Sequence, residues 1–154
     1  MPKKLIEMGN VRGDRQRRVM ERIEALKECP FCEENLKKYH KQKIIKQGKY
    51  WTLTPNQWPY DDTELHLLAI ARKHVERLDD LSKAAFTELL ELFQWAERKY
   101  KLDYGAIAMR FGDVGGTGAT VLHLHAHLIV ANPDPAPGSD RVRFPIGPKP
   151  PKQG

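Results

Sequence analysis

The segment His-Leu-His-Ala-His at 123–127 constrains the fold of this chain more than any other feature. In a β-strand, alternate side chains lie on the same face, so the three histidines project to one side and the apolar residues to the other. A helix would instead place His125 opposite the other two histidines and distribute the apolar residues around its axis. The alternation therefore predicts a strand over residues 121–130, with one apolar face and one face rich in imidazole.

Three imidazoles on one strand face indicate a reactive site, because each ring brings nitrogens that need polar partners. The alternative interpretation is the solvent-facing side of an antiparallel sheet, where polar residues also alternate. One metal ion cannot be shared by all three rings, since residues i and i+4 of a strand lie about 13 Å apart and zinc lies about 2 Å from its ligands. We therefore expect separate roles for His123, His125 and His127, beside the glycine-rich segment 112–118.

The apolar patterns elsewhere predict an α+β fold with an antiparallel sheet, one long packed helix and a short N-terminal helix. Further strands are expected over 43–46, 50–54, 65–71 and 104–111. Helices are expected over 14–28, capped by Asp14, and from Ser82, as the cap, to Tyr100. The side of the long helix that packs on the sheet is expected to carry Phe86, Leu89, Leu90, Phe93, Ala96 and Tyr100.

The length of 154 residues is that of one domain, so we expect a single domain over residues 1–154. Residues 1–28 are interpreted as an N-terminal helical extension, and residues 131–154 as a proline-rich, loop-like C-terminal tail. The apolar runs are shorter than a membrane span or the core of a secretory signal. These features favour a soluble, cytoplasmic protein with no membrane partner.

The formal net charge of +6 favours phosphate-bearing partners, but it does not distinguish a nucleotide from a nucleic acid or an anionic membrane. Much of the positive charge lies in the segments 12–22 and 37–49. Charge runs of this kind are usually solvated faces, so nucleic acid is not the expected partner.

The histidine segment, extended to Leu128 and Ile129, resembles the His-φ-His-φ-His-φ-φ signature of the histidine-triad (HIT) superfamily, in which φ is apolar. Three other segments are similar to the family pattern in the same order: Cys-Pro-Phe-Cys at 29–32, Asn-Gln-Trp-Pro-Tyr at 56–60 and Ile-Ala-Arg-Lys-His-Val at 70–75. The resemblance covers about residues 29–130. It implies a HIT-like fold and nucleotide hydrolase or nucleotidyltransferase activity.

The resemblance also implies roles for individual residues of these segments. His125 is the implied nucleophile, which attacks the α-phosphate of a nucleotide conjugate or dinucleoside polyphosphate and forms a covalent nucleotidyl-histidine. His127 would contact the phosphate or the leaving group, and His123 completes the catalytic set. The implied nucleotide-binding residues are Asn56, Gly118, Ala119 and Thr120, with backbone amides around Gly116 as part of an anion-binding nest. An Asn before Pro-Tyr is also an ordinary turn residue.

The base of a purine nucleotide is expected between apolar side chains on the hairpin side of the sheet. Phe31, Ile44 and Leu53 are the candidates, and each is also a typical core residue. Members of the family are commonly dimers through the long helix and the adjoining strand, so the resemblance implies a homodimer.

Cys29 and Cys32 form a Cys-x-x-Cys pair, which in a reducing compartment points to a redox pair or half of a zinc site rather than to a structural disulfide. A tetrahedral zinc site needs two more ligands. The resemblance supplies His74 and His123, so the implied zinc site consists of these four residues. The alternative is that the cysteines bind no metal. His40 is a poor substitute ligand, because it lies in a basic segment.

Ala119 occupies a position where many family members carry a glutamine, so a side-chain amide is lost, while Gly118 and the hydroxyl of Thr120 remain. This departure supports an alternative function, a nucleotide-binding or signalling module with little turnover. Repair of adenylylated nucleic-acid ends would use the same chemistry. It ranks lower, because the sequence has no appended zinc-finger pattern.

Overall fold

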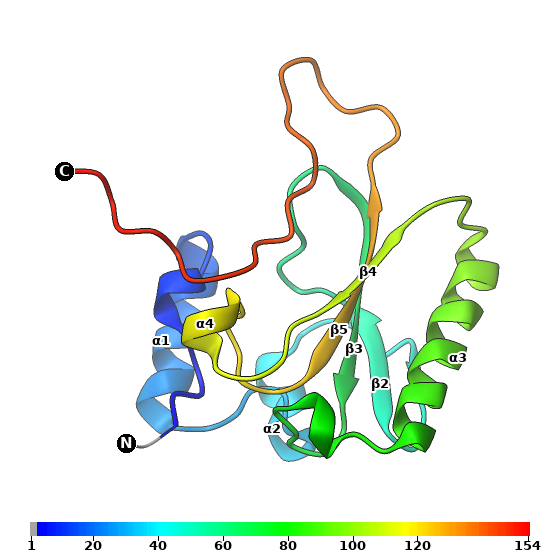
Figure 1. The fold of residues 1–154 in the computed structure, drawn as a ribbon, viewed down its shortest axis with the longest axis horizontal. Helices are drawn as coiled ribbons and strands as arrows, with labels where there is room; N and C mark the ends of the chain where they lie inside the picture. The colour runs from blue at the N-terminus through cyan, green and yellow to red at the C-terminus, as the bar shows by residue number, and fades with distance from the viewer. Residues whose placement is uncertain (1–2) are drawn as a thin grey trace.

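Figure 1 shows the computed structural model, which describes residues 3–154 and is built around a five-stranded antiparallel sheet of order β1-β2-β3-β5-β4. The strands are β1 (Lys46–Gln47), β2 (Trp51–Pro55), β3 (Thr63–Ala71), β4 (Ala106–Met109) and β5 (His125–Ala131). The helices are α1 (Asp14–Leu26), α2 (Glu33–Tyr39), α3 (Lys83–Tyr100) and α4 (Val114–Thr117), with 3-10 turns at Met8–Asn10 and Leu78–Asp80. The predicted α+β class with an antiparallel sheet is confirmed.

Helix α3 covers one face of the sheet (Figure 1). Ser82 caps it as predicted, since its side chain accepts a hydrogen bond from the Ala85 amide at 3.1 Å. The buried residues of the helix are Ala85, Leu89, Leu92, Phe93 and Ala96. Neither α3 nor any other helix between residues 3 and 154 is long and apolar enough to cross a membrane.

The inward side of α3 is rotated from its predicted position. Phe86, Leu90 and Tyr100, which were placed on the packed side, are exposed, whereas Leu92 is buried. The apolar residues of this helix span a wider arc than one sheet face covers, so half of them are left on the surface.

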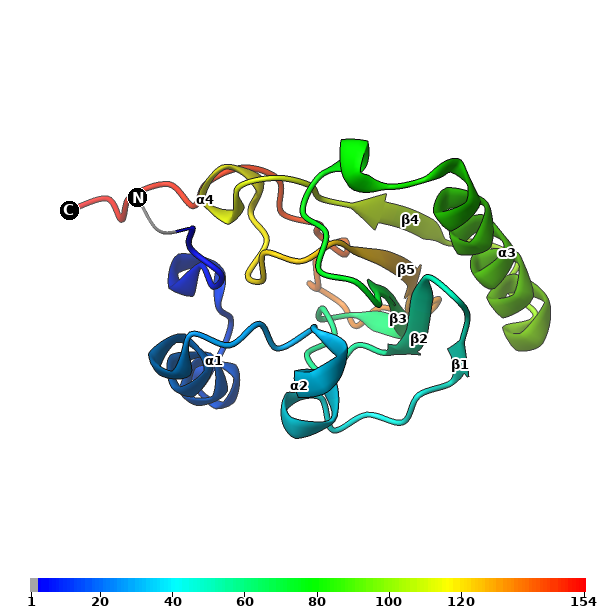
Figure 2. The same ribbon diagram turned by 90° about the horizontal axis from the view of Figure 1, so that it is seen from below.

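On the opposite side of the sheet, α2 packs against β3, and α1 lies further away (Figure 2). Met20 and Ile23 of α1 lie in a buried cluster with Ile6, Cys29 and Val121. This cluster joins the N-terminal segment to the chain that leads into β5. The space between α1 and the sheet is where the histidines face.

Helix α1 differs from its prediction at both ends. Asp14 is the first residue rather than the cap, because Gly13 precedes it and no side chain caps the helix. The helix ends at Leu26 instead of residue 28, because Lys27 adopts the left-handed conformation with φ 53°. Leu26, the last residue of the helix, is exposed.

Helix α2 was not predicted, because seven residues are too few for a periodic apolar pattern. Glutamates in its first turn and lysines in its last turn complement the helix dipole. Leu36 attaches the helix to the sheet by packing against Leu68 and Ile70 of β3.

Strand β5 begins at His125, four residues later than the predicted start at 121. Two amides before the strand form hydrogen bonds with segments outside the sheet. Leu122 donates its amide hydrogen to the Leu5 carbonyl, and Leu124 donates to the Val75 carbonyl. His123 therefore lies just outside the strand. The predicted strand 104–111 is reduced to β4, and the predicted strand 43–46 shares only Lys46 with β1. Among the described strands, these two outer strands each pair with one neighbour only.

Residues 132–154 contain no helix or strand, as their composition predicts, but they fold back toward α4 (Figure 1). The Gly147 amide donates to the Thr117 carbonyl at 3.1 Å. Phe144 is half-buried, and its ring lies against those of Tyr60 and His127. The tail is thus a loop that contacts the histidine face of the sheet.

Candidate functional site

The pairing of β3 with β5 assembles the histidine cluster. It sets His127 opposite Leu68 and His125 opposite Ile70. The ring centroids of His66 and His127 lie 5.1 Å apart, and those of His127 and His125 lie 5.2 Å apart. His125 and His127 line an open cavity between the sheet and α1.

His125 has a defined protonation state. Its Nδ1 lies 2.7 Å from the His123 carbonyl oxygen, and because a carbonyl can only accept, Nδ1 must carry the hydrogen. Burial lowers the pKa of His125 to about 4, so the ring is neutral at pH 7. The remaining nitrogen, Nε2, therefore has a free lone pair. Phe31 packs edge-on against this ring at 5.0 Å between centroids.

His66 and His127 form a chain of hydrogen bonds with one direction. The Tyr60 amide donates to His66 Nδ1 at 3.1 Å, so the hydrogen of His66 is on Nε2. That Nε2 lies 2.8 Å from His127 Nδ1 and donates to it. Burial lowers the pKa of His66 to about 4 and that of His127 well below its usual value, so both rings are neutral.

The hydrogen of His127 must consequently be on Nε2. This atom is buried and has no hydrogen-bond partner among the residues that the structure describes. A buried donor without a partner is costly. The site therefore presents one nitrogen with a lone pair, on His125, and one N–H that lacks an acceptor, on His127.

Asn56 lines the cavity. Its Oδ1 accepts a hydrogen bond from the Trp58 amide at 2.8 Å, which is the ordinary turn role. Its Nδ2 carries hydrogens and lies 3.5 Å from His66 Nδ1, the ring nitrogen that can accept. Asn56 thus contacts the histidine chain as well as the cavity.

The glycine-rich loop contributes only part of the expected anion-binding set. Gly118 and Thr120 line the cavity. Ala119 is buried against Val114 and does not line it. The Ala119 amide donates to Thr117 Oγ1 at 3.3 Å and the Gly116 amide to the Asp113 carbonyl at 3.1 Å, so these two hydrogens are engaged within the loop.

The apolar wall of the cavity differs from the expected one. Phe31 belongs to it, but Leu53 is completely buried on the α3 side of the sheet and Ile44 lies in a different groove. The sequence does not predict α2 and assigns α1 to an N-terminal extension. The cavity residues that these two helices contribute were therefore missed: Val19, Met20, Ile23 and Tyr39.

Two arginines at the cavity were also missed, Arg12 and Arg110. The Arg12 guanidinium lies 4.4 Å from the centroid of the Tyr60 ring, and that of Arg110 lies 3.7 Å from the Phe144 ring. The segment 12–22 was interpreted as a solvated charge run, which holds for its exposed helical arginines but not for the contacts of Arg12. The sequence carried no signal that separated these two arginines from the others.

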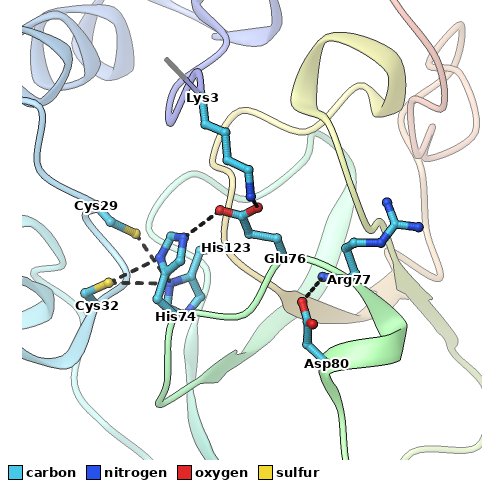
Figure 3. A network of polar contacts seen from close by, with 8 residues as sticks. All are labelled: Lys3, Cys29, Cys32, His74, Glu76, Arg77, Asp80 and His123. Carbon is cyan, nitrogen blue, oxygen red and sulfur yellow. Dashed lines mark hydrogen bonds and ion pairs between the residues drawn. The ribbon is translucent and has the colours of Figure 1, made fainter. Parts of the chain in front are cut away.

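The structure brings the four expected metal ligands together, as Figure 3 shows. One donor atom each from Cys29, Cys32, His74 and His123 lies within 4.8 Å of the others. Burial raises the pKa of Cys32 to about 12 and also raises that of Cys29, so an ion that binds there must displace thiol protons. The donor set is compatible with zinc.

The orientation of His123 suits a ligand. Its Nε2 lies 2.6 Å from the Ala71 carbonyl oxygen and must donate to it, which leaves Nδ1 without a hydrogen. This Nδ1 lies 3.3 Å from Cys29 Sγ. On the other side of the cluster, His74 Nε2 lies 3.0 Å from Glu76, which in turn contacts Lys3 (Figure 3). Both histidines are thus held from outside the cluster, as metal-bound histidines usually are.

A family model described as the HIT domain matches residues 38–134 of the chain. The match includes the histidine strand and ends before most of the tail. No curated protein has a significant match to the sequence.

Several solved structures are similar in fold. A zinc-bound histidine triad family protein from Mycobacterium smegmatis is 21% identical with a TM-score of 0.54, over 77% of this chain and 84% of that protein. A HIT family hydrolase from Clostridium thermocellum is 18% identical with a TM-score of 0.52, over 75% and 97%. The diadenosine triphosphate hydrolase of Plasmodium falciparum, in complex with cyclomarin A, is 21% identical with a TM-score of 0.51, over 61% and 64%.

Replacing Gly118 by alanine should destabilise the protein. Gly118 has φ +84°, and an added Cβ would lie 2.9 Å from the Pro145 carbonyl oxygen. We expect the free energy of unfolding in urea to fall by about 1 kcal/mol or more. Gly116→Ala is the matched control, because an added Cβ there meets nothing within 4 Å among the described residues. Equal stability of the two variants would contradict this account of the loop.

Proposed function

Because this chain belongs to the HIT domain family, we propose that it is an enzyme that hydrolyses or transfers the nucleotidyl group of a nucleotide conjugate or dinucleoside polyphosphate. The observation that carries the proposal is the complementary protonation of two adjacent rings. His125 Nε2 offers a lone pair, and His127 Nε2 offers a hydrogen that has no acceptor among the described residues. A ring with a nucleophilic lone pair and a ring with a spare N–H donor therefore line the same cavity.

In the first step, the lone pair of His125 Nε2 attacks the α-phosphorus, and the bond between phosphorus and the leaving group breaks. The leaving group departs with the electrons of that bond, and the His127 N–H donates a hydrogen bond to the charge that develops on it. The ring of His125 gains positive charge, which the hydrogen bond from Nδ1 to the His123 carbonyl stabilises. The covalent intermediate divides one difficult displacement into two easier ones.

In the second step, an acceptor attacks the phosphorus of the nucleotidyl-histidine from the open side of the cavity. The bond between phosphorus and Nε2 breaks, its electrons return to His125, and the acceptor releases its proton to solvent. Water as acceptor gives hydrolysis, and an alcohol or phosphate gives transfer. The nucleotide base is proposed to bind against Phe31 and the apolar residues of α1 and α2, which suits the large flat surface of a purine.

A nucleotide-binding module with little turnover is the second candidate function. It is favoured by Ala119, which is buried and offers no side-chain donor to the cavity. Incubation with nucleoside phosphoramidates, adenylyl sulfate and dinucleoside polyphosphates separates the two functions. Tight nucleotide binding without turnover of any of these substrates supports the module.

We also propose that Cys29, Cys32, His74 and His123 bind one zinc ion. Support comes from the proximity of their donor atoms and from the unprotonated Nδ1 of His123. Four protein ligands fill a tetrahedral site, so zinc would contribute structure and leave no open position for water. The ligands come from the segment before α2, the loop after β3 and the approach to β5. The ion would therefore hold the His123 carbonyl in place beside His125.

Replacing His125 by alanine should abolish turnover while the protein stays folded. The β-strand tolerates alanine, but the nucleophile is lost, so we expect kcat to fall by about three orders of magnitude or more. Mass spectrometry of wild-type protein mixed with substrate should detect a nucleotidyl adduct, and the variant should show none. Unchanged turnover by a variant with normal circular dichroism would disprove the mechanism.

Replacing Cys32 or His74 by alanine should release zinc and lower the melting temperature, because three ligands bind the ion more weakly than four. Elemental analysis of untagged protein prepared without chelator should give about one zinc per wild-type chain. His40→Ala is the control, since His40 contacts Thr54 and lies outside the cluster. This control should retain its zinc. Wild-type protein with far less than one zinc, and a melting temperature insensitive to chelator, would refute the metal site.

We propose in addition that the protein is a homodimer through α3 and β4. Phe86, Leu90, Tyr104 and Ile107 are 54%, 52%, 52% and 59% exposed. Three of them, Leu90, Tyr104 and Ile107, line one groove between α3 and β4, and the outer edge of β4 is unpaired among the described strands. An exposed apolar groove beside an open strand edge is typical of a protein interface.

Sedimentation velocity should therefore give the mass of a dimer for the wild type and that of a monomer for Ile107→Glu. A buried charge without a partner prevents association. Ile146→Glu in the tail is the matched control, because Ile146 is 83% exposed and lies away from this groove. A monomeric wild type, or dissociation by both variants, would rule out this interface.

A further inference from the structure

Arg12 and Arg110 are far apart in the sequence, and both contact Tyr60 at the cavity. Arg12 precedes α1, and its guanidinium stacks on the Tyr60 ring at 4.4 Å. Arg110 follows β4, and its Nη2 donates to the Tyr60 hydroxyl at 3.1 Å. The Tyr60 ring is in turn stacked on His127, at 5.8 Å between centroids. Two guanidinium groups, which are permanently charged, therefore contact the ring that stacks on His127.

Neither arginine forms an ion pair within the part of the chain that the structure describes. The neighbouring imidazoles are neutral, and partial burial lowers the pKa of Arg12 by removing water from its cation. Asp61, Asp62 and Asp140 line the outer wall beyond Arg12, where Asp140 is already paired with Arg143. The side of these two guanidinium groups that faces the cavity thus carries positive charge, and no aspartate or glutamate is among the described residues that line the cavity.

Both guanidinium groups are held in place by backbone carbonyls. Arg12 donates to Trp58 and Pro59, and Arg110 Nε donates to the Pro145 carbonyl at 2.8 Å. The Arg110 guanidinium packs on the Phe144 ring, 3.7 Å from its centroid. Each guanidinium has five N–H donors, so these contacts leave several donors available. A fixed guanidinium with spare donors binds phosphate at a small entropic cost.

The two ends of the cavity have different chemistry around the reacting histidines. At one end, Phe31 lies against His125, and apolar residues of α1 line the cavity beside it. At the other end, Tyr60 and Phe144 lie against His127, and the two arginines contact these rings. A nucleotide whose base occupies the apolar end has its leaving group at the His127 end, beside the arginines.

We propose that Arg12 and Arg110 form a subsite for the leaving group, and that this leaving group is a chain of phosphates rather than an amine or a single sulfate. The inference rests on the proposed function for its assignment to the leaving group. The substrate class is then a nucleoside or dinucleoside polyphosphate. Arg12 and Arg110 lie where they bind the phosphates that depart after attack on the α-phosphorus.

The test compares kcat/KM for diadenosine triphosphate and for adenosine 5′-phosphoramidate, whose leaving group is ammonia. Arg12→Gln and Arg110→Gln should each lower the ratio of the two values by about ten-fold or more, as expected for loss of a charge-assisted contact. Arg15→Gln, an exposed arginine on α1, should leave the ratio unchanged. Equal losses on both substrates would overturn the proposal.

Binding of inorganic triphosphate, measured by calorimetry, tests the subsite without turnover. Each glutamine variant should bind it about ten-fold or more weakly than wild type, while Arg12→Lys and Arg110→Lys should bind more tightly than the corresponding glutamine variants. Unchanged affinity in the glutamine variants overturns the subsite. If Arg110→Gln does not fold, Arg12→Gln decides alone, because Arg12 lies in the segment before α1, outside the helices and strands.

The two proposals fail in different ways. Absence of turnover and of any covalent adduct with both substrates refutes the proposed function, and the triphosphate titration still decides the subsite. Turnover of the phosphoramidate alone, with no binding of triphosphate, refutes the subsite and leaves the proposed function intact.

Discussion

The hydrogen bond between His125 Nδ1 and the His123 carbonyl determines what the rest of the site can do. A carbonyl oxygen only accepts, so this single contact fixes the hydrogen of His125 on one nitrogen and exposes the lone pair of the other. The ring of His123 is fixed in the same way by the Ala71 carbonyl, which turns its Nδ1 toward the cysteines. Two backbone carbonyls at the junction of β3 and β5 therefore set the protonation of both rings.

Burial and charge have complementary roles around this junction. Removal of water keeps His66, His123 and His125 neutral, with pKa values lowered to about 4, so that an imidazole remains unprotonated at pH 7. A neutral site alone would not attract a phosphate. The positive charge is instead carried by guanidinium groups, which stay ionised when partly buried. The free lone pair and the positive charge of the site are thus carried by different residues.

The sequence predicted those parts of the site in which a local pattern determines the geometry. The alternation at 123–127 predicted the histidine face, and the resemblance placed four metal ligands that the structure does bring together. Contacts made by irregular segments carry no such pattern, so Phe144 at His127 could not be foreseen from a proline-rich tail. Helix α2 was missed for a related reason, since its short charged sequence stabilises a helix without producing an apolar period.

Both ends of the chain reach the cavity from outside the region that matches the family: Arg12 precedes residues 38–134, and Phe144 and Pro145 follow them. Strand β5, which carries His125 and His127, is held within that region by its pairing with β3 and β4. The contacts that the two terminal segments make with the cavity can therefore change in evolution without altering the strand pairing that positions His125 and His127. Exchange of a terminal segment between relatives would replace the contacts of Arg12 or of Phe144, whereas Arg110, inside the matched region, would stay with the shared core.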